Sequence, residues 1–298
     1  MIEKKSWRGL KTGVPAEGDI LILGVPFDGA VSNARGAAEA PAHLRKLSAL
    51  NPPVSEDGLD LRKLTIADQG DVNLDPEDGS YFGRVEKEAA ALIATGKPSL
   101  FLGGDHSVTI PLGRAFAGYY SPKPVGMIHL DSHCDLMDSY DGHRWSHACP
   151  QRRFLEHENV VSKNLVMAGI RNFEVEEMEF LRENSAITVI NARQFYSRNH
   201  KEIQSQIVEA LKDVEAVYLS LDIDVLDPAY APGTGVPEAG GLSTREVIEL
   251  VREIMGNLPV KAVDLVEVAP VLDYRDITSW AAVKIIYEIF ATLVTTKQ

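Results

Sequence analysis

The chain has 298 residues, a formal net charge of −13 and a sequence pI of about 5.1. Because nucleic-acid phosphates are bound by basic surfaces, this charge argues against nucleic acid as the main partner and is compatible with a small cationic one. The hydrophobic content of 45% and the charged content of 24% are typical of a globular protein with a large core.

Short apolar runs alternate with longer amphipathic stretches along the chain. Eight runs are expected to be strands, at residues 19–25, 64–68, 99–102, 125–130, 164–170, 186–190, 216–221 and 260–266. Five stretches have apolar residues at helical spacing, at residues 81–95, 174–183, 201–211, 243–255 and 278–294. Ser243 with Glu246 three residues later is typical of a capping box. The alternation predicts an α/β fold with a parallel sheet, in a single domain over residues 1–298.

Polar motifs follow the predicted strands at five places. They lie at residues 103–106, 131–135, 169–172 and 222–224 and at Glu267. In an open parallel sheet the ligand site lies beyond the carboxyl ends of the strands. Solvated charges have no reason to select the same strand end five times, so the pattern predicts a functional site at this edge.

Metal-ligating side chains recur at alternate positions in two of these motifs. Asp131, His133 and Asp135 follow one apolar run, and Asp222 and Asp224 follow another. Alternate side chains of an extended backbone leave the same face, and buried acids are costly unless a cation compensates them. The predicted cage has six members: His106, Asp131, His133, Asp135, Asp222 and Asp224. Its carboxylates favour two Mn²⁺ ions, with zinc or iron as alternatives, and such a pair can lower the pKa of a shared water.

Several neighbouring polar residues are expected to have structural roles. We expect His129 to be a satisfied core histidine that faces away from Asp131 and His133. Cys134 is expected to face away from the metals, as is Ser132. The remaining acids are interpreted as a turn or supporting group (Asp105), a turn residue (Asp227), a buried hydrogen-bonding group (Asp264) and loop acids (Asp138 and Asp141).

The location of the protein follows from weaker signals. The two cysteines, Cys134 and Cys149, are too few for a disulfide framework. Residues 1–5 contain no apolar signal segment, and we expect no apolar stretch to approach the ~20 residues that span a bilayer. These observations predict a cytoplasmic protein with no membrane partner.

Together the motifs resemble a known family. The segments at 103–107, 131–135 and 220–228 resemble the three metal motifs of the ureohydrolases, the arginase and agmatinase family. The third motif continues through residues 231–242 in a form similar to the agmatinase branch. The resemblance begins near Gly24 and ends near Pro270, so it covers almost the whole chain.

The resemblance implies a three-layer α/β/α sandwich around an eight-stranded parallel sheet, two Mn²⁺ ions per chain, and a homo-oligomer, trimeric or hexameric. It places His106 and Asp135 on one ion, His133 and Asp224 on the other, and Asp131 and Asp222 between them. It further implies that Glu267 receives the substrate guanidinium and that His147 is the pocket histidine.

The substrate is less sharply predicted. Arginases carry an asparagine where this chain has Met137, so the carboxylate of arginine lacks an expected partner and a decarboxylated guanidine such as agmatine fits better. The distal ammonium of agmatine would be stabilised by an acid. Asp138, Asp141 and Glu174 are candidates, on loops near the rim. The carboxylate of guanidinobutyrate or guanidinopropionate would instead be stabilised by a cation. The candidates are Arg144, Arg152, Arg153 and Arg171.

The predicted reaction is hydrolysis of a guanidino compound to urea and an amine, putrescine in the case of agmatine. Glu267 would orient the guanidinium, Asp135 would protonate the leaving nitrogen and His147 would exchange protons with bulk water. The alternatives are action on a formimino compound or arginine, a zinc deacetylase on a related scaffold, and a non-catalytic metal-bearing protein.

Overall fold

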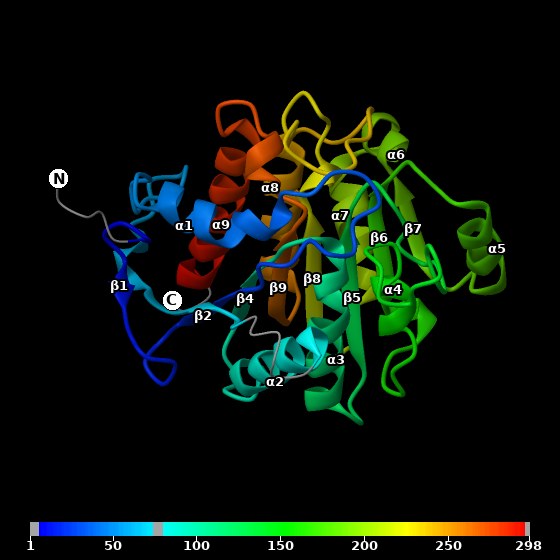
Figure 1. The fold of residues 1–298 in the computed structure, drawn as a ribbon, viewed down its shortest axis with the longest axis horizontal. Coiled ribbons are helices and arrows are strands. Elements are labelled where there is room, and N and C mark those ends of the chain that lie inside the picture. Colours follow the sequence, from blue (N-terminus) through cyan, green and yellow to red (C-terminus); the bar gives the residue numbers. More distant parts are fainter. Residues whose placement is uncertain (1–5, 74–79, 296–298) are drawn as a thin grey trace.

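The computed structural model describes residues 6–73 and 80–295, and its strands form one parallel sheet. The order across the sheet is β1-β3-β2-β4-β9-β8-β5-β6-β7 (Figure 1). The strands are β1 (Lys11–Thr12), β2 (Ile20–Gly24), β3 (Thr65–Asp71), β4 (Ser99–Leu102), β5 (Val125–Leu130), β6 (Leu165–Ile170), β7 (Thr188–Asn191), β8 (Ala216–Asp222) and β9 (Val260–Val266).

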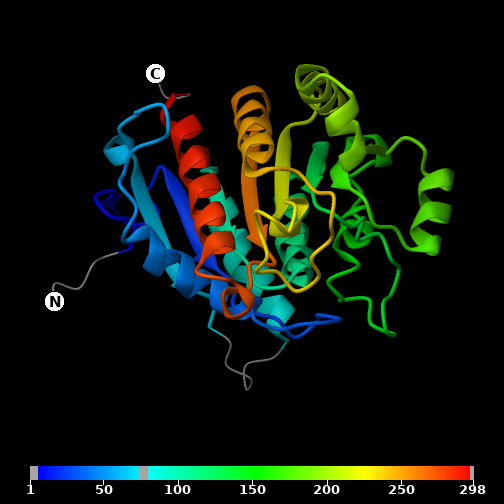
Figure 2. The ribbon, with the colours of Figure 1, turned by 90° about the horizontal axis from the view of Figure 1, so that it is seen from above.

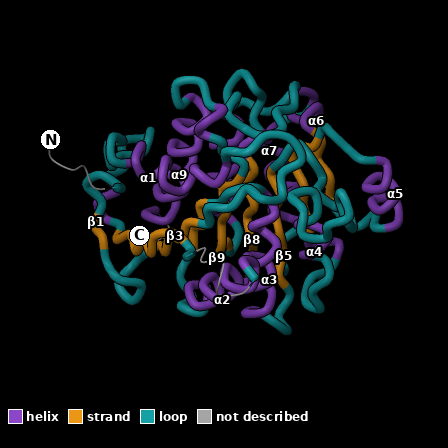
Figure 3. Tube along the Cα trace, viewed as in Figure 1, coloured by secondary structure: helices purple, strands orange, loops and turns teal. Residues whose placement is uncertain are grey.

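Helices cover both faces of the sheet, which makes three layers (Figures 2 and 3). Side chains of one set pack into one core cluster: α1 (Ala40–Ser48), α6 (Ala192–Ser197), α7 (His200–Ala210), α8 (Thr244–Asn257) and α9 (Ile277–Thr295). Those of the other set pack into a second cluster: α2 (Tyr81–Ile93), α3 (Thr109–Tyr120), α4 (Pro150–Phe154) and α5 (Val175–Glu183). The predicted α/β class with a parallel sheet is confirmed.

The strand pattern explains this burial. All residues of β2, β4, β5, β6 and β8 are buried, so these runs are apolar on both faces rather than alternating. All eight expected strands are present, but the count of eight is wrong because the structure has a ninth. Strand β1 pairs with β3 at the sheet edge and is exposed, and two residues are too short to show a period.

Helix prediction succeeded where the apolar spacing is regular. The capping box at Ser243 and Glu246 begins α8 as expected. Helices α1, α3, α4 and α6 were not predicted. Helix α3 contains Pro111 and two glycines, Gly113 and Gly118, which sequence rules treat as helix breakers, yet burial of its side chains outweighs their low propensity.

Helix α9 corrects the expectation that no apolar stretch approaches the length needed to span a bilayer. Its 19 residues are long and apolar enough to cross a membrane by length and composition. However, 67% of its most apolar window is buried within the fold, and Val283, Ile286 and Phe290 belong to the core beneath the sheet. A core helix meets the same criteria, so this helix is weak evidence for a membrane span.

The sheet order places the polar motifs side by side. Strands β4, β9, β8, β5 and β6 are consecutive neighbours, and each is followed at its carboxyl end by one of the five motifs. The prediction that these motifs share one edge is therefore confirmed, and the site lies at the middle of the sheet.

Candidate active site

His106 lies just beyond β4 and is surrounded by acids. Its Nδ1 atom is 3.0 Å from carboxylate oxygens of Asp131, Asp135 and Asp222. The preceding residue, Asp105, accepts a hydrogen bond from the Ser107 amide (3.0 Å) and so holds the turn in place, as expected. Three residues from two distant segments are thus gathered around one imidazole nitrogen.

The 131–135 motif is a loop rather than the end of a strand. Strand β5 ends at Leu130, so alternation does not decide which way these side chains point. Asp135 has a positive φ of 53°, a conformation that non-glycine residues rarely adopt and that turns it toward His106. Ser132, expected to point away, instead donates its hydroxyl to Asp224 (2.8 Å), whereas Cys134 packs in the core as predicted.

A second group of ligand atoms forms around His133. Its Nδ1 atom is 3.1 Å from Asp224 and 3.4 Å from Asp131. Asp131, Asp224 and His133 offer atoms that all lie within 4.8 Å of one another, as a metal requires. Asp131 therefore belongs to both groups, with His106 on one side and His133 on the other.

The electrostatics of the cluster fit a cation. Among the described residues, His106 Nδ1 and Asp131 Oδ2 are buried without a hydrogen-bond partner. Burial, reinforced by the carboxylates of Asp224 and Asp131, raises the pKa of Asp222 well above its ordinary value, and burial together with Asp105 does the same to the pKa of Glu267. No lysine or arginine stands among the described residues that line the pocket. Crowded buried acids of this kind are stabilised by divalent cations, and the oxygen and imidazole donors suit hard or borderline metals.

A buried relay fixes the orientation of the His106 ring. Ser220 donates its hydroxyl to Asp264 (2.8 Å), so the same oxygen accepts from His106 Nε2, 2.9 Å away. Asp264 also accepts from the hydroxyls of Thr109 and Tyr218, both at 2.7 Å. With its proton on Nε2, the ring presents the lone pair of Nδ1 to the acids, as a metal ligand must. Asp264 has the predicted buried hydrogen-bonding role, whereas Ser220 was missed although it precedes Asp222 by two positions on the same strand.

His129 is closer to the site than predicted. Its Nε2 atom lies 3.3 Å from Asp131, so the expectation that it faces away is wrong. It is nevertheless a satisfied core histidine. Nε2 is 2.9 Å from the carbonyl of His133, which can only accept, and Nδ1 is 2.8 Å from the Gln151 amide nitrogen. Both ring nitrogens are occupied, so we do not count His129 among the metal ligands.

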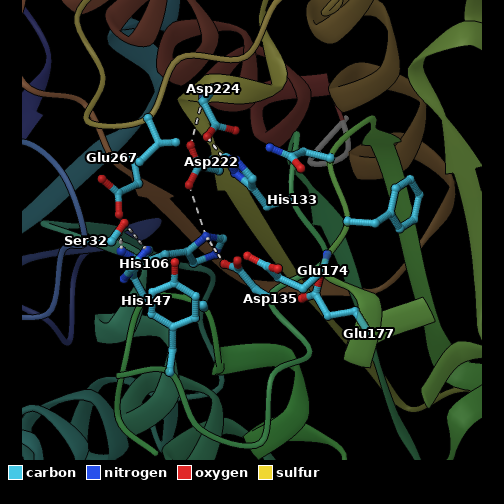
Figure 4. Close-up of a pocket in the computed structure, with 15 residues that line it drawn as sticks. Ser32, His106, His133, Asp135, His147, Glu174, Glu177, Asp222, Asp224 and Glu267 are labelled. Carbon is cyan, nitrogen blue, oxygen red and sulfur yellow. Dashed lines mark hydrogen bonds and ion pairs between the residues drawn. The ribbon is translucent and has the colours of Figure 1, made fainter. Parts of the chain in front are cut away.

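Glu267 and His147 face the same pocket (Figure 4). Glu267 follows β9 with a positive φ of 60°, and its Oε1 accepts from the His106 amide (2.7 Å). His147 Nδ1 is 2.6 Å from the carbonyl of Ala30, which can only accept, so the neutral ring carries its proton there. Nε2 is then an acceptor for the Ser32 hydroxyl at 3.2 Å.

The pocket thus contains almost every predicted site residue. Its lining includes His106, His133, Asp135, His147, Asp222, Asp224 and Glu267, and Asp131 lies beneath them as the shared group. It also includes residues that the sequence did not indicate: Ser32, Tyr140, Phe173 and Glu177. Burial raises the pKa of Glu177 to about 7, and its carboxylate accepts from the Leu136 and Glu174 amides.

The charged loop residues are mostly engaged elsewhere. Arg171 donates to main-chain carbonyls, including those of Asp224 (2.6 Å) and Glu238 (2.7 Å). Arg153 and Arg144 pair with Asp138 and Glu156. The guanidinium of Arg152 lies 3.7 Å from the ring centre of Phe180. Glu174 lines the pocket and forms a capping box with Glu177 at the start of α5. None of the four arginines is among the described lining residues, so the pocket offers no cation for an acidic substrate tail.

Known proteins resemble the chain over nearly its full length. The model of the arginase family matches residues 18–291. The guanidino acid hydrolase of human mitochondria is 33% identical over 92% of this chain and 78% of its own length. The agmatinase of Bacillus anthracis is 34% identical over 91% of each chain. The crystal structure of agmatine ureohydrolase from Thermoplasma volcanium superposes with a TM-score of 0.86 and 28% identity, covering 100% of this chain and 97% of that one.

Proposed function

The chain belongs to the arginase family of metal-dependent amidinohydrolases, and from this premise we propose that it hydrolyses agmatine to urea and putrescine with two Mn²⁺ ions. The family membership removes the deacetylase and the non-catalytic alternatives. The relatives carry names for both cationic and acidic guanidines, so the substrate has to be argued from the pocket.

The charge of the pocket supports a cationic substrate. Six acids line it, with no lysine or arginine among the described lining residues: the proposed metal ligands Asp135, Asp222 and Asp224, and also Glu174, Glu177 and Glu267. A guanidino acid would bring a carboxylate into this surrounding without a partner, which is costly. Agmatine carries positive charge at both ends. The absence of a lining cation is the observation that carries this choice.

The six proposed ligands would divide between two ions, and the contacts of Asp131 with both histidines and of Asp222 with His106 support this arrangement. His106 and Asp135 would hold one ion, His133 and Asp224 the other, with Asp131 and Asp222 shared. When bound, the ions lower the pKa of water and stabilise the negative charge of the transition state.

The chain's own residues then have separate tasks. Glu267 pairs with the guanidinium, two acceptors against two donors, and so orients its carbon above the ligand cage. Asp135, which faces the pocket, takes a proton from the attacking water and gives it to the leaving nitrogen. His147 takes up protons at Nε2, which carries a lone pair and hydrogen-bonds to Ser32.

The test is urea release by the manganese-loaded protein from agmatine, arginine, guanidinobutyrate and guanidinopropionate. We expect agmatine to have the highest kcat/KM. A higher value for guanidinobutyrate would overturn the substrate assignment while leaving the reaction intact. Urea release from none of the four would overturn the reaction itself.

A further inference from the structure

A second hollow of about 300 Å³ adjoins the metal pocket. The two share three lining residues, Ser32, Tyr140 and His147. Its volume is at the lower end of the range for small-molecule sites. We call this hollow the annex.

The annex has aromatic walls from three distant segments of the chain. Phe82 of α2 has its ring centre 5.7 Å from that of Phe27, in the loop after β2, and 4.9 Å from that of Trp145, in the loop before α4. Trp145 is 39% exposed, although a large aromatic side chain normally gains by being covered. An exposed aromatic ring beside a reaction pocket is suited to binding an organic cation.

The annex carries a negative charge, which suits a cationic ligand. Asp141 lines it, has a positive φ of 48° and makes no ion pair within residues 6–73 and 80–295. No lysine or arginine is among the described residues of its wall. The guanidinium of Arg114 lies 5.4 Å from the Trp145 ring centre, but it lines a different hollow together with Arg144 and Arg153.

Backbone contacts fix the position of the annex relative to the metal pocket. The Asp105 amide donates to the Phe27 carbonyl (2.7 Å), and the Ala30 amide donates to the Asp105 side chain (2.8 Å). A Cβ at Gly104 would lie 1.7 Å from the Phe27 carbonyl oxygen, so only glycine allows this approach. The loop that carries Phe27 and Ser32 is therefore fixed to the segment that carries His106.

From these contacts we infer that the annex binds the distal ammonium of a guanidinoalkylamine, against the exposed side of the Trp145 ring and near Asp141. This inference rests on the proposed function and names the part of the site that distinguishes an amine tail from an acidic or neutral one. The tail passes Tyr140 and leaves the metal pocket on the side of His147. Figure 4 shows that Glu174 lies on the other side of the pocket.

The test compares two substrates that differ only at the tail: agmatine and pentylguanidine, in which a methyl group replaces the ammonium. Trp145→Leu is expected to raise the KM for agmatine about 5- to 30-fold with little change in kcat, and the KM for pentylguanidine by less. Trp145→Phe should restore most of the agmatine KM because it keeps a ring face. Asp141→Asn should raise only the agmatine KM, by about 2- to 5-fold.

Glu156→Gln is the matched control, because it removes an acid from a neighbouring hollow and lines neither the annex nor the metal pocket. We expect it to change the agmatine KM by less than about twofold, which is below the effect expected for Asp141→Asn. Equal losses for both substrates in Trp145→Leu would show apolar packing only and overturn the inference, as would a larger agmatine KM effect in Glu156→Gln than in Asp141→Asn. If the wild-type protein releases no urea from either substrate, the reaction has failed rather than the annex alone.

Discussion

Removal of the Ser220 hydroxyl should weaken metal binding, in addition to any cost that it brings to the metal-free fold. In Ser220→Ala the buried Nε2–H of His106 loses its acceptor. Without metal the ring can shift its proton to Nδ1, which lies 3.0 Å from each of three carboxylates, so the loss is avoided. Metal binding needs the Nδ1 lone pair and forces the proton back to Nε2.

The magnitude follows from this difference between the two states. A buried donor left unpaired costs about 1–3 kcal/mol, which corresponds to a loss of about 5- to 150-fold in metal affinity. Asp264 also loses one donor, but it does so with and without metal, and it keeps Thr109 and Tyr218. The cost of this lost hydrogen bond is the same with and without metal, so it does not change the metal affinity.

The assay is manganese affinity by equilibrium dialysis with metal analysis, together with the melting temperature of the metal-free protein. Thr109→Val is the control, since it removes a donor to Asp264 but leaves Ser220 in contact with His106. We expect the control to lower stability in both states and to leave affinity unchanged. Unaltered manganese affinity in Ser220→Ala, or an equal loss in Thr109→Val, would refute the reasoning.

Three further changes separate metal binding, turnover and stability. Asp131→Asn should reduce bound manganese and urea release together, since Asp131 lies in both ligand groups; full metal occupancy would contradict its shared role. Glu267→Gln should keep the manganese content but lower kcat/KM for agmatine at least 100-fold, by about 3 kcal/mol, since a charged hydrogen bond to the guanidinium is lost; unchanged kinetics would exclude Glu267 from substrate binding. The hydrogen bond from Arg245 lowers the pKa of Glu56 to about 2, so its stabilisation is present above pH 4.5 and is lost as the pH falls through about 2. Glu56→Gln should therefore lower the free energy of unfolding by about 1 kcal/mol at pH 7 and by much less at pH 2, measured in urea; an equal loss at both pH values would rule out the ion pair as the cause.

Much of the architecture was predictable because burial dictates composition. Strands covered on both faces have to be apolar, so runs such as those at β5 and β8 are visible without any structural information. The order of the strands was not visible. Strand β9 lies between β4 and β8 although more than 150 residues separate β4 from it in the chain, and only tertiary packing determines that pairing.

The site was predictable at the level of residues but not of conformation. The ligand types predicted six cage members, and the structure brings these residues together, yet side-chain alternation does not apply beyond Leu130, where the chain leaves the strand. It also failed to show that His129 approaches Asp131. Ser32 and Tyr140 lie in irregular loops with no period or motif, so nothing in the sequence placed them beside His147.

The origin of the two halves of the pocket has a consequence for redesign. The cage is carried by short segments anchored to central strands, whereas Phe27, Ser32, Asp141 and Trp145 stand on surface loops. A library confined to those loops would vary which tail is accepted while the reactive centre keeps its rigid support. Gly104 should be kept unchanged in such a library, because its backbone contacts the backbone of Phe27 where the two halves meet.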